Sequence, residues 1–218
     1  MTYFKRVLVL MLLGLPLLAC ADDAVPAAPE YKEGVNYAVL EEPVRTRDAS
    51  KIEVVEVFWY GCIHCSHFDP LVTNWKKTLS NDVDFWLSPA MWNQAMETHA
   101  RIFYTADRLG IEPKVHTALF TALLEERKPM VEPQQIEDFF ADFGVDRDKF
   151  RKIFNSFGVS SLVKQANARA RGYRITGTPE LVINGKYRID AKMAGGQPEM
   201  LKVADFLIAK ERAARARQ

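Results

Sequence analysis

The first half of the folded region combines two hydrophobic patterns. Residues 51–60 (KIEVVEVFWY) are rich in β-branched and aromatic residues, which predicts a mostly buried strand. Gly61 interrupts this run, and from residue 62 to about residue 79 apolar positions recur at helical spacing, with Pro70 inside the expected helix. Residues 83–87 predict a second strand. This part of the chain therefore predicts a β-α-β unit with parallel strands.

A long block with helical periodicity follows, from about residue 93 to residue 172. We expect five helices in it, over residues 95–109, 114–127, 133–143, 148–157 and 160–171. Glycines follow three of them, as is common at helix ends: Gly110, Gly144 and Gly172.

The chain then returns to a strand pattern. Residues 180–183 and 186–189 are short runs separated by Asn184-Gly185, a strong signal for a two-residue hairpin turn. A final amphipathic helix is expected over residues 197–214.

The order of these elements is β-α-β, a helical block, and then β-β-α. Without the block, this is the order of thioredoxin. We therefore predict an α/β, thioredoxin-like fold with an inserted helical domain. The thioredoxin-like parts are expected at residues 37–92 and 173–218, and the inserted domain at residues 93–172.

The first 21 residues have the pattern of a signal peptide. Lys5 and Arg6 precede an uncharged run of 13 residues, Val7 to Ala19, which is too short to span a bilayer comfortably. Cleavage after Ala21 would give a soluble protein. A lipoprotein signal ending before Cys20 would instead leave that cysteine lipid-anchored. Both alternatives predict a periplasmic protein, with residues 22–36 as a flexible lead-in.

Composition and charge limit the classes of protein to which this chain can belong. Apolar residues make up 48% of the chain and charged residues 26%, which is typical of a globular protein. The chain has 29 basic and 28 acidic side chains, so its charge gives no reason to expect nucleic acid as a partner.

Both cleavage alternatives leave the folded part with only Cys62 and Cys65. A disulfide between them closes too small a loop to add much stability, so the pair is expected to have a chemical role. It follows a strand and opens a helix, whose N-terminal N–H groups and dipole stabilise a thiolate on Cys62. His64, when protonated, would add a positive charge nearby. Stabilising the thiolate stabilises the reduced protein, and so makes its disulfide a better oxidant.

Other interpretations of the cysteine pair can be compared with this one. Haem attachment needs histidine where Ser66 stands, and a structural zinc site needs four ligands that can surround the metal. A copper site formed by Cys62, Cys65 and His64 stays open, as does a purely structural pair. His64 could also be a solvated spacer, and ordinary surface or core positions are expected for the remaining histidines, His67, His99 and His116.

The motifs FWYGCIHC and GTPELVINGKY, together with the signal peptide and the helical insertion, resemble the DsbA family of periplasmic dithiol oxidases. The resemblance implies that Cys62 is the exposed nucleophile and Cys65 its buried partner. It further implies that Thr178-Pro179 is the cis-proline loop that binds the client backbone, although an X-Pro bond taken alone would be expected to be trans.

Glu56, six residues before Cys62, occupies the position of a family acidic residue beneath the active site. The resemblance implies that it exchanges protons with Cys65. Strand alternation leaves open that Glu56 faces solvent instead.

The family also implies secreted client proteins and reoxidation by a DsbB-like membrane partner linked to quinone. No cofactor is expected, and the small domain with its insertion suggests a monomer. Two residues depart from the common pattern, because Ile63 replaces proline and Thr178 replaces valine. With these two substitutions, the family resemblance does not determine the redox potential of the cysteine pair. A thiol reductase or isomerase on the same scaffold is therefore the first alternative function, and a periplasmic copper chaperone is the second.

Overall fold

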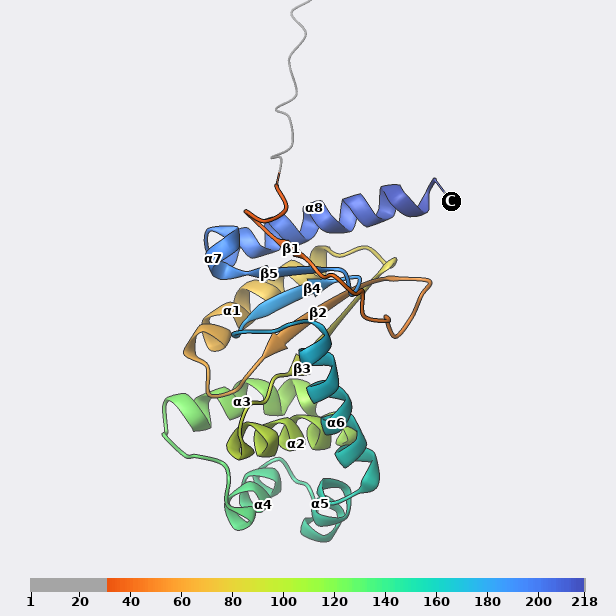
Figure 1. Cartoon of the computed structure of the whole chain (residues 1–218). Helices are drawn as coiled ribbons and strands as arrows, with labels where there is room; N and C mark the ends of the chain where they lie inside the picture. Colours follow the sequence, from red (N-terminus) through yellow and green to blue (C-terminus); the bar gives the residue numbers. More distant parts are fainter. Residues whose placement is uncertain (1–30, 218) are drawn as a thin grey trace, which may run out of the picture. The chain divides into compact units, whose positions relative to one another are not determined.

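A five-stranded sheet runs through the centre of the structure (Figure 1). The computed structural model describes residues 31–217. The strand order is β1-β5-β4-β2-β3, in which β2 and β3 are parallel and the other neighbours antiparallel. The strands are β1 (Ala38–Val39), β2 (Ile52–Phe58), β3 (Val83–Pro89), β4 (Glu180–Ile183) and β5 (Tyr187–Asp190). The predicted β-α-β unit and the predicted hairpin are therefore confirmed.

Both faces of β2, which lies between β4 and β3, are covered, and all seven of its residues are buried. Ile52 and Val54 belong to one hydrophobic cluster, which includes α1 (Ile63–Trp75) and α8 (Gln197–Arg215). Val55 and Val57 belong to a second cluster on the opposite face, with residues of the helical insertion. This burial explains why the sequence of β2 is an almost continuous apolar run.

Five helices lie between β3 and β4 in the chain, and Figure 1 shows them in green to teal. They are α2 (Gln94–Leu109), α3 (Glu112–Leu124), α4 (Pro133–Asp142), α5 (Arg147–Phe154) and α6 (Phe157–Gly172). α2 contacts α3, α5 and α6, and both α2 and α6 contact β3. The fold is therefore a thioredoxin-like sheet that carries a helical insertion, as the sequence predicts.

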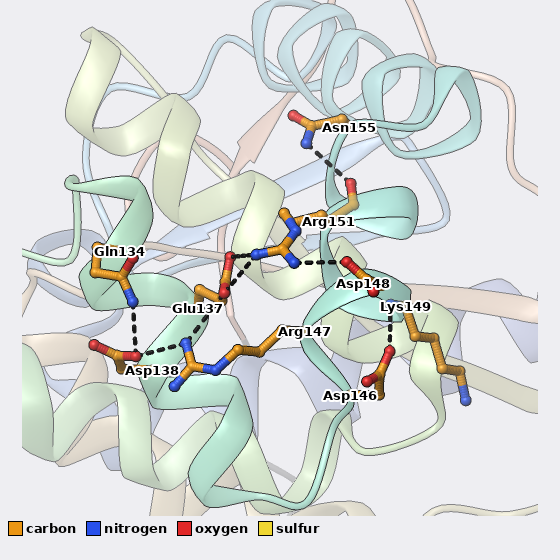
Figure 2. Close-up of polar contacts among 9 residues, drawn as sticks. All are labelled: Gln134, Glu137, Asp138, Asp146, Arg147, Asp148, Lys149, Arg151 and Asn155. Carbon is orange, nitrogen blue, oxygen red and sulfur yellow. Dashed lines mark hydrogen bonds and ion pairs between the residues drawn. The ribbon is translucent and has the colours of Figure 1, made fainter.

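An ionic cluster joins α4 to α5 (Figure 2). Glu137 of α4 is buried and accepts hydrogen bonds from Nη1 of Arg151 at 2.7 and 2.8 Å and from Nη1 of Arg147 at 3.1 Å. Arg147 also pairs with Asp138, and Arg151 with Asp148. α5 is short and buries only Phe150 fully, so these bonds to a buried carboxylate supplement a small apolar contact.

Some element boundaries differ from the predictions. The structure begins α6 at Phe157, which the sequence pattern assigns to the preceding helix, because the Ser156 hydroxyl accepts from the Val159 N–H and caps α6 there. The helix after the cysteines ends at Trp75 and continues as a 3-10 turn, Lys76–Thr78. β1 and the four-residue α7 (Ala191–Ala194) are not predicted at all.

The predictions for the N-terminal segment mostly fall outside the described part of the chain. The signal peptide, its two cleavage alternatives and most of the lead-in lie before residue 31. Within residues 31–217, no helix is long and apolar enough to span a membrane.

The hairpin turn at Asn184-Gly185 gives a test of the fold. Both residues have positive φ, 51° and 63°, and a Cβ on Gly185 would lie 1.9 Å from the carbonyl oxygen of Val44. We expect Gly185→Ala to lower the free energy of unfolding by about 2 kcal/mol or more, from strain and the clash. Gly110→Ala is the control, because Gly110 has φ 71° but no atom within 4 Å of the added carbon. Equal losses for the two variants in urea denaturation would contradict the clash.

Candidate active site

The two cysteines lie where β2 passes into α1. The Cys62 N–H donates to the carbonyl oxygen of Trp59 at 3.1 Å, which closes a turn, and Cys62 is the N-cap of α1. The Cys65 N–H points back to the Cys62 sulfur at 3.4 Å. Cys62 is partly exposed, whereas Cys65 is completely buried, and both are free thiols in this structure.

Their surroundings give the two sulfurs opposite acidities. The pKa of Cys62 is lowered to about 5, mainly by the hydrogen bond from the Cys65 side chain and further by Thr178 and the N–H groups of Cys65 and His64, against the opposing effect of burial. Burial raises the pKa of Cys65, and the neighbouring Cys62 raises it further. At neutral pH, Cys62 is therefore a thiolate and Cys65 a thiol, whose S–H donates a hydrogen bond to the Cys62 sulfur.

The loop before β4 faces Cys62. The Thr178-Pro179 peptide bond is cis, and the carbonyl oxygen of Thr178 lies 3.2 Å from the Cys62 sulfur. The structure thus brings Cys62, Cys65 and this loop together, as the sequence resemblance implies. The hydroxyl-bearing residue before the proline acts directly on the nucleophile, because Thr178 helps to lower the pKa of Cys62.

His64 lies on the exposed side of the first turn of α1. Its carbonyl oxygen accepts from Nε2 of Gln197, the first residue of α8, at 2.6 Å. Among residues 31–217, no hydrogen bond joins the imidazole to either sulfur. What acts on the Cys62 sulfur is the backbone N–H of His64.

Glu56 is buried within β2, only 4% exposed, so the solvent-facing alternative for this residue is wrong. Its pKa is raised to about 8, first by burial and then by the negative charge of Asp69, with Lys76 acting in the opposite direction. The side chain lines a cavity of about 630 Å³ that Asp69 and Lys76 of the α1 region also line. Neither cysteine lines this cavity, and among the described residues no hydrogen bond joins Glu56 to Cys65.

A second group of residues supports the segment before Cys62, and the sequence alone did not reveal it. The Trp59 indole N–H donates to Nδ1 of His99 at 3.0 Å, and Nε2 of His99 lies 2.9 Å from the carbonyl oxygen of Pro129. The Trp59 ring covers Gly61 so closely that a Cβ there would lie 2.3 Å from it. Gly61 is therefore required by a packing contact.

The other two histidines have ordinary surroundings. His116 is buried and lies 2.9 Å from the Tyr60 hydroxyl and 3.4 Å from a carboxylate oxygen of Asp69, whereas His67 is exposed on α1. In the part of the chain that the structure describes, no three side chains of the metal-binding types are grouped so that they could hold an ion. A copper site at Cys62 and Cys65 would therefore need ligands from elsewhere.

The sequence pattern also does not single out the residue that holds the loop opposite the cysteines. Glu180, the first residue of β4, is 1% exposed. One of its carboxylate oxygens accepts from the N–H groups of Thr176 and Gly177 at 3.0 and 2.8 Å. The sequence carried one signal, a carboxylate that opens an otherwise apolar strand directly after a proline.

Comparisons with known proteins agree with this geometry. Residues 72–207 match the model of the DSBA-like thioredoxin domain family. The thiol:disulfide interchange protein DsbA of Pseudomonas aeruginosa is 41% identical over 205 residues, which cover 94% of this chain and 97% of that protein. The thiol:disulfide interchange protein DsbA of Burkholderia cepacia is 37% identical, over 94% of this chain and 96% of that protein.

Solved structures show the same likeness. The crystal structure of Pseudomonas aeruginosa DsbA superposes with a TM-score of 0.82 at 43% identity and covers 85% of this chain and 97% of that chain. The oxidoreductase DsbA from Xylella fastidiosa superposes with a TM-score of 0.78 at 35% identity, over 85% and 99% of the two chains.

Proposed function

We propose, from the premise that this chain belongs to the DsbA family and is a thiol:disulfide oxidoreductase, that it oxidises secreted proteins with its Cys62–Cys65 disulfide. The observation that carries this direction of transfer is the opposite acidity of the two sulfurs, with the pKa of Cys62 lowered to about 5. A stabilised thiolate favours the reduced protein, and so favours the release of the disulfide to a client.

The proposed exchange has two steps. A client thiolate attacks the Cys62 sulfur, the Cys62–Cys65 bond breaks, and Cys65 leaves with the electron pair and takes up a proton. A second client thiolate then attacks the client sulfur of the mixed disulfide, and Cys62 leaves as a thiolate. The client loses two electrons, which the two cysteines gain. The low pKa of Cys62 makes it a good leaving group in the second step.

Other residues are assigned within the same proposal. Thr178 and Pro179 form the substrate-binding loop beside Cys62, which the 3.2 Å contact between the sulfur and the Thr178 carbonyl supports. Glu56 is the proposed source of the proton that Cys65 takes up, because its pKa of about 8 keeps the carboxyl protonated near neutral pH. His64 adds a positive charge beside the thiolate when its imidazole is protonated.

Location and partners complete the proposal. The signal-peptide pattern and the family support a periplasmic protein, either released into that compartment or lipid-anchored through Cys20. The clients are reduced secreted proteins. A DsbB-like membrane protein linked to quinone reoxidises Cys62 and Cys65, and the protein acts as a monomer.

The equilibrium reduction potential of the Cys62–Cys65 pair, measured against glutathione buffers, tests the proposed direction. We expect a potential above about −200 mV, more oxidising than the about −270 mV of thioredoxin, because the Cys62 thiolate is stabilised. A thioredoxin-like value would contradict the oxidase and favour a reductase. Thr178→Val is the informative second variant, since Thr178 contributes to the low pKa of Cys62.

A further inference from the structure

Glu180 connects the central sheet to the loop beside Cys62. The loop from Ile175 to Pro179 is irregular, so its backbone N–H groups have no strand partners. Oε1 of Glu180 accepts from the N–H groups of Thr176 and Gly177, and from the Thr176 hydroxyl at 3.3 Å. A single carboxylate oxygen therefore binds two consecutive backbone donors of the loop, and bonds of this kind to a charged acceptor are strong.

Arg188 of β5 forms an ion pair, without a hydrogen bond, with the other carboxylate oxygen of Glu180. Glu180 lies opposite Asp190 and Val182 lies opposite Arg188 in the antiparallel pair, so Arg188 is the diagonal neighbour of Glu180 on the same face. Nε of Arg188 is 3.4 Å from Oε2 of Glu180. Arg188 also donates to the carbonyl oxygen of Arg174, which precedes the loop. Two side chains of the sheet thus hold the backbone at residues 174, 176 and 177.

The next residue along the loop contacts the nucleophile. The carbonyl oxygen of Thr178 lies 3.2 Å from the Cys62 sulfur, and its position follows from that of the two residues before it. A loop without these bonds would gain backbone freedom where the client is proposed to bind.

We propose that Glu180 is a positioning residue, which holds residues 176–178 in the conformation that receives the client and lies against Cys62. This inference rests on the proposed function in so far as the loop binds the client. Its effect on the Cys62 thiolate stands independently of any client.

The experiment compares three variants of the full-length protein. Glu180→Ala removes the acceptor of the loop, whereas Glu180→Gln keeps a side-chain carbonyl of the same reach and loses the charge. Glu137→Ala is the matched control, because Glu137 is also a buried carboxylate with arginine partners but holds α4 to α5. Each variant is measured for the second-order rate of oxidation of a reduced dithiol peptide, and for the thiolate absorbance of Cys62 against pH.

We expect Glu180→Ala to lower the second-order rate about tenfold, the order expected from losing one or two bonds to a charged group. The midpoint of the thiolate titration should rise in the same variant. Glu180→Gln should keep the rate within about threefold, and Glu137→Ala should change neither quantity although it also destabilises the protein. A normal rate and a normal titration in Glu180→Ala would overturn the proposal, as would equal changes in Glu137→Ala.

Hydrogen exchange on the unmodified protein covers the case in which Glu180→Ala does not fold. The amide protons of Thr176 and Gly177 should then be strongly protected, because both are bound to the buried carboxylate. Exchange as fast as in a free loop would overturn the proposal. If the unmodified protein oxidises no peptide at all, the proposed function fails, while the titration and the exchange measurement still decide whether Glu180 positions the loop.

Discussion

Replacing Cys62 with serine is expected to abolish the oxidation of reduced clients. Only the slow oxidation that occurs in buffer without the enzyme should remain. Cys62 holds the sulfur that is partly exposed and that a client can reach, while Cys65 is completely buried. A serine hydroxyl forms no disulfide, so neither step of the exchange can occur. The measurement is the rate at which an unfolded, reduced protein regains its disulfides on addition of the oxidised enzyme.

Cys65→Ser is the matched variant, because it removes the partner sulfur and keeps the nucleophile. It should lack catalytic turnover as well, but it should accumulate a mixed disulfide with an oxidised client through Cys62, visible as a shift in mass that dithiothreitol reverses. In Cys65→Ser, the absorbance of the Cys62 thiolate should still appear as the pH rises. The pKa of Cys62 should be higher than in the original protein, since the hydrogen bond from Cys65 is the largest cause of its low value. Persistent client oxidation by Cys62→Ser would exclude Cys62 as the nucleophile.

Glu56→Gln is expected to stabilise the protein at alkaline pH, and this is the second large effect. The pKa of Glu56 rises from 4.5 to about 8 in the folded protein, mainly through burial, so the folded state binds a proton more tightly than the unfolded state. The stability that comes from the protonated carboxyl is complete below about pH 4.5 and is lost as the pH rises toward 8. Since one pKa unit corresponds to about 1.4 kcal/mol, the loss is on the order of 4 kcal/mol by pH 8.

A neutral glutamine avoids this loss. Urea denaturation of Glu56→Gln should therefore give a higher free energy of unfolding than the original protein at pH 8, and nearly the same value at pH 4.5. The control is Glu42→Gln, because Glu42 is an exposed carboxylate on the loop after β1, and its removal should change little at either pH. The same dependence on pH in Glu56→Gln and in the original protein would show that Glu56 is ionised at no unusual cost.

The parts of the fold that the sequence predicts are those set by local patterns. β2 is a mostly apolar run, β4 and β5 are joined by Asn184-Gly185, and the cysteine pair follows a strand and opens a helix. β1 has two residues and exists only because it pairs with β5. The start of α6 depends on whether Ser156 caps a helix, and the hydrophobic pattern around Phe157 does not reveal that choice.

The same distinction applies to the site. Cys62, Cys65 and Pro179 belong to recognisable motifs, so their proximity could be expected from the family resemblance. The supporting residues come from distant parts of the chain: His99 lies 40 positions after Trp59, and Arg188 meets Glu180 only across the hairpin. Whether Glu56 is buried depends on which helices cover each face of the sheet, and strand alternation alone does not settle it.

The support of the segment before Cys62 has a consequence for disulfide exchange. Trp59 is held by His99 of α2 and Tyr60 by His116 of α3, while the turn after Cys62 is bonded to Gln197 of α8 through the His64 carbonyl. The two sulfurs therefore sit between anchors from separate parts of the molecule. We therefore expect the backbone on both sides of the pair to keep its position when the bond between the sulfurs is made or broken.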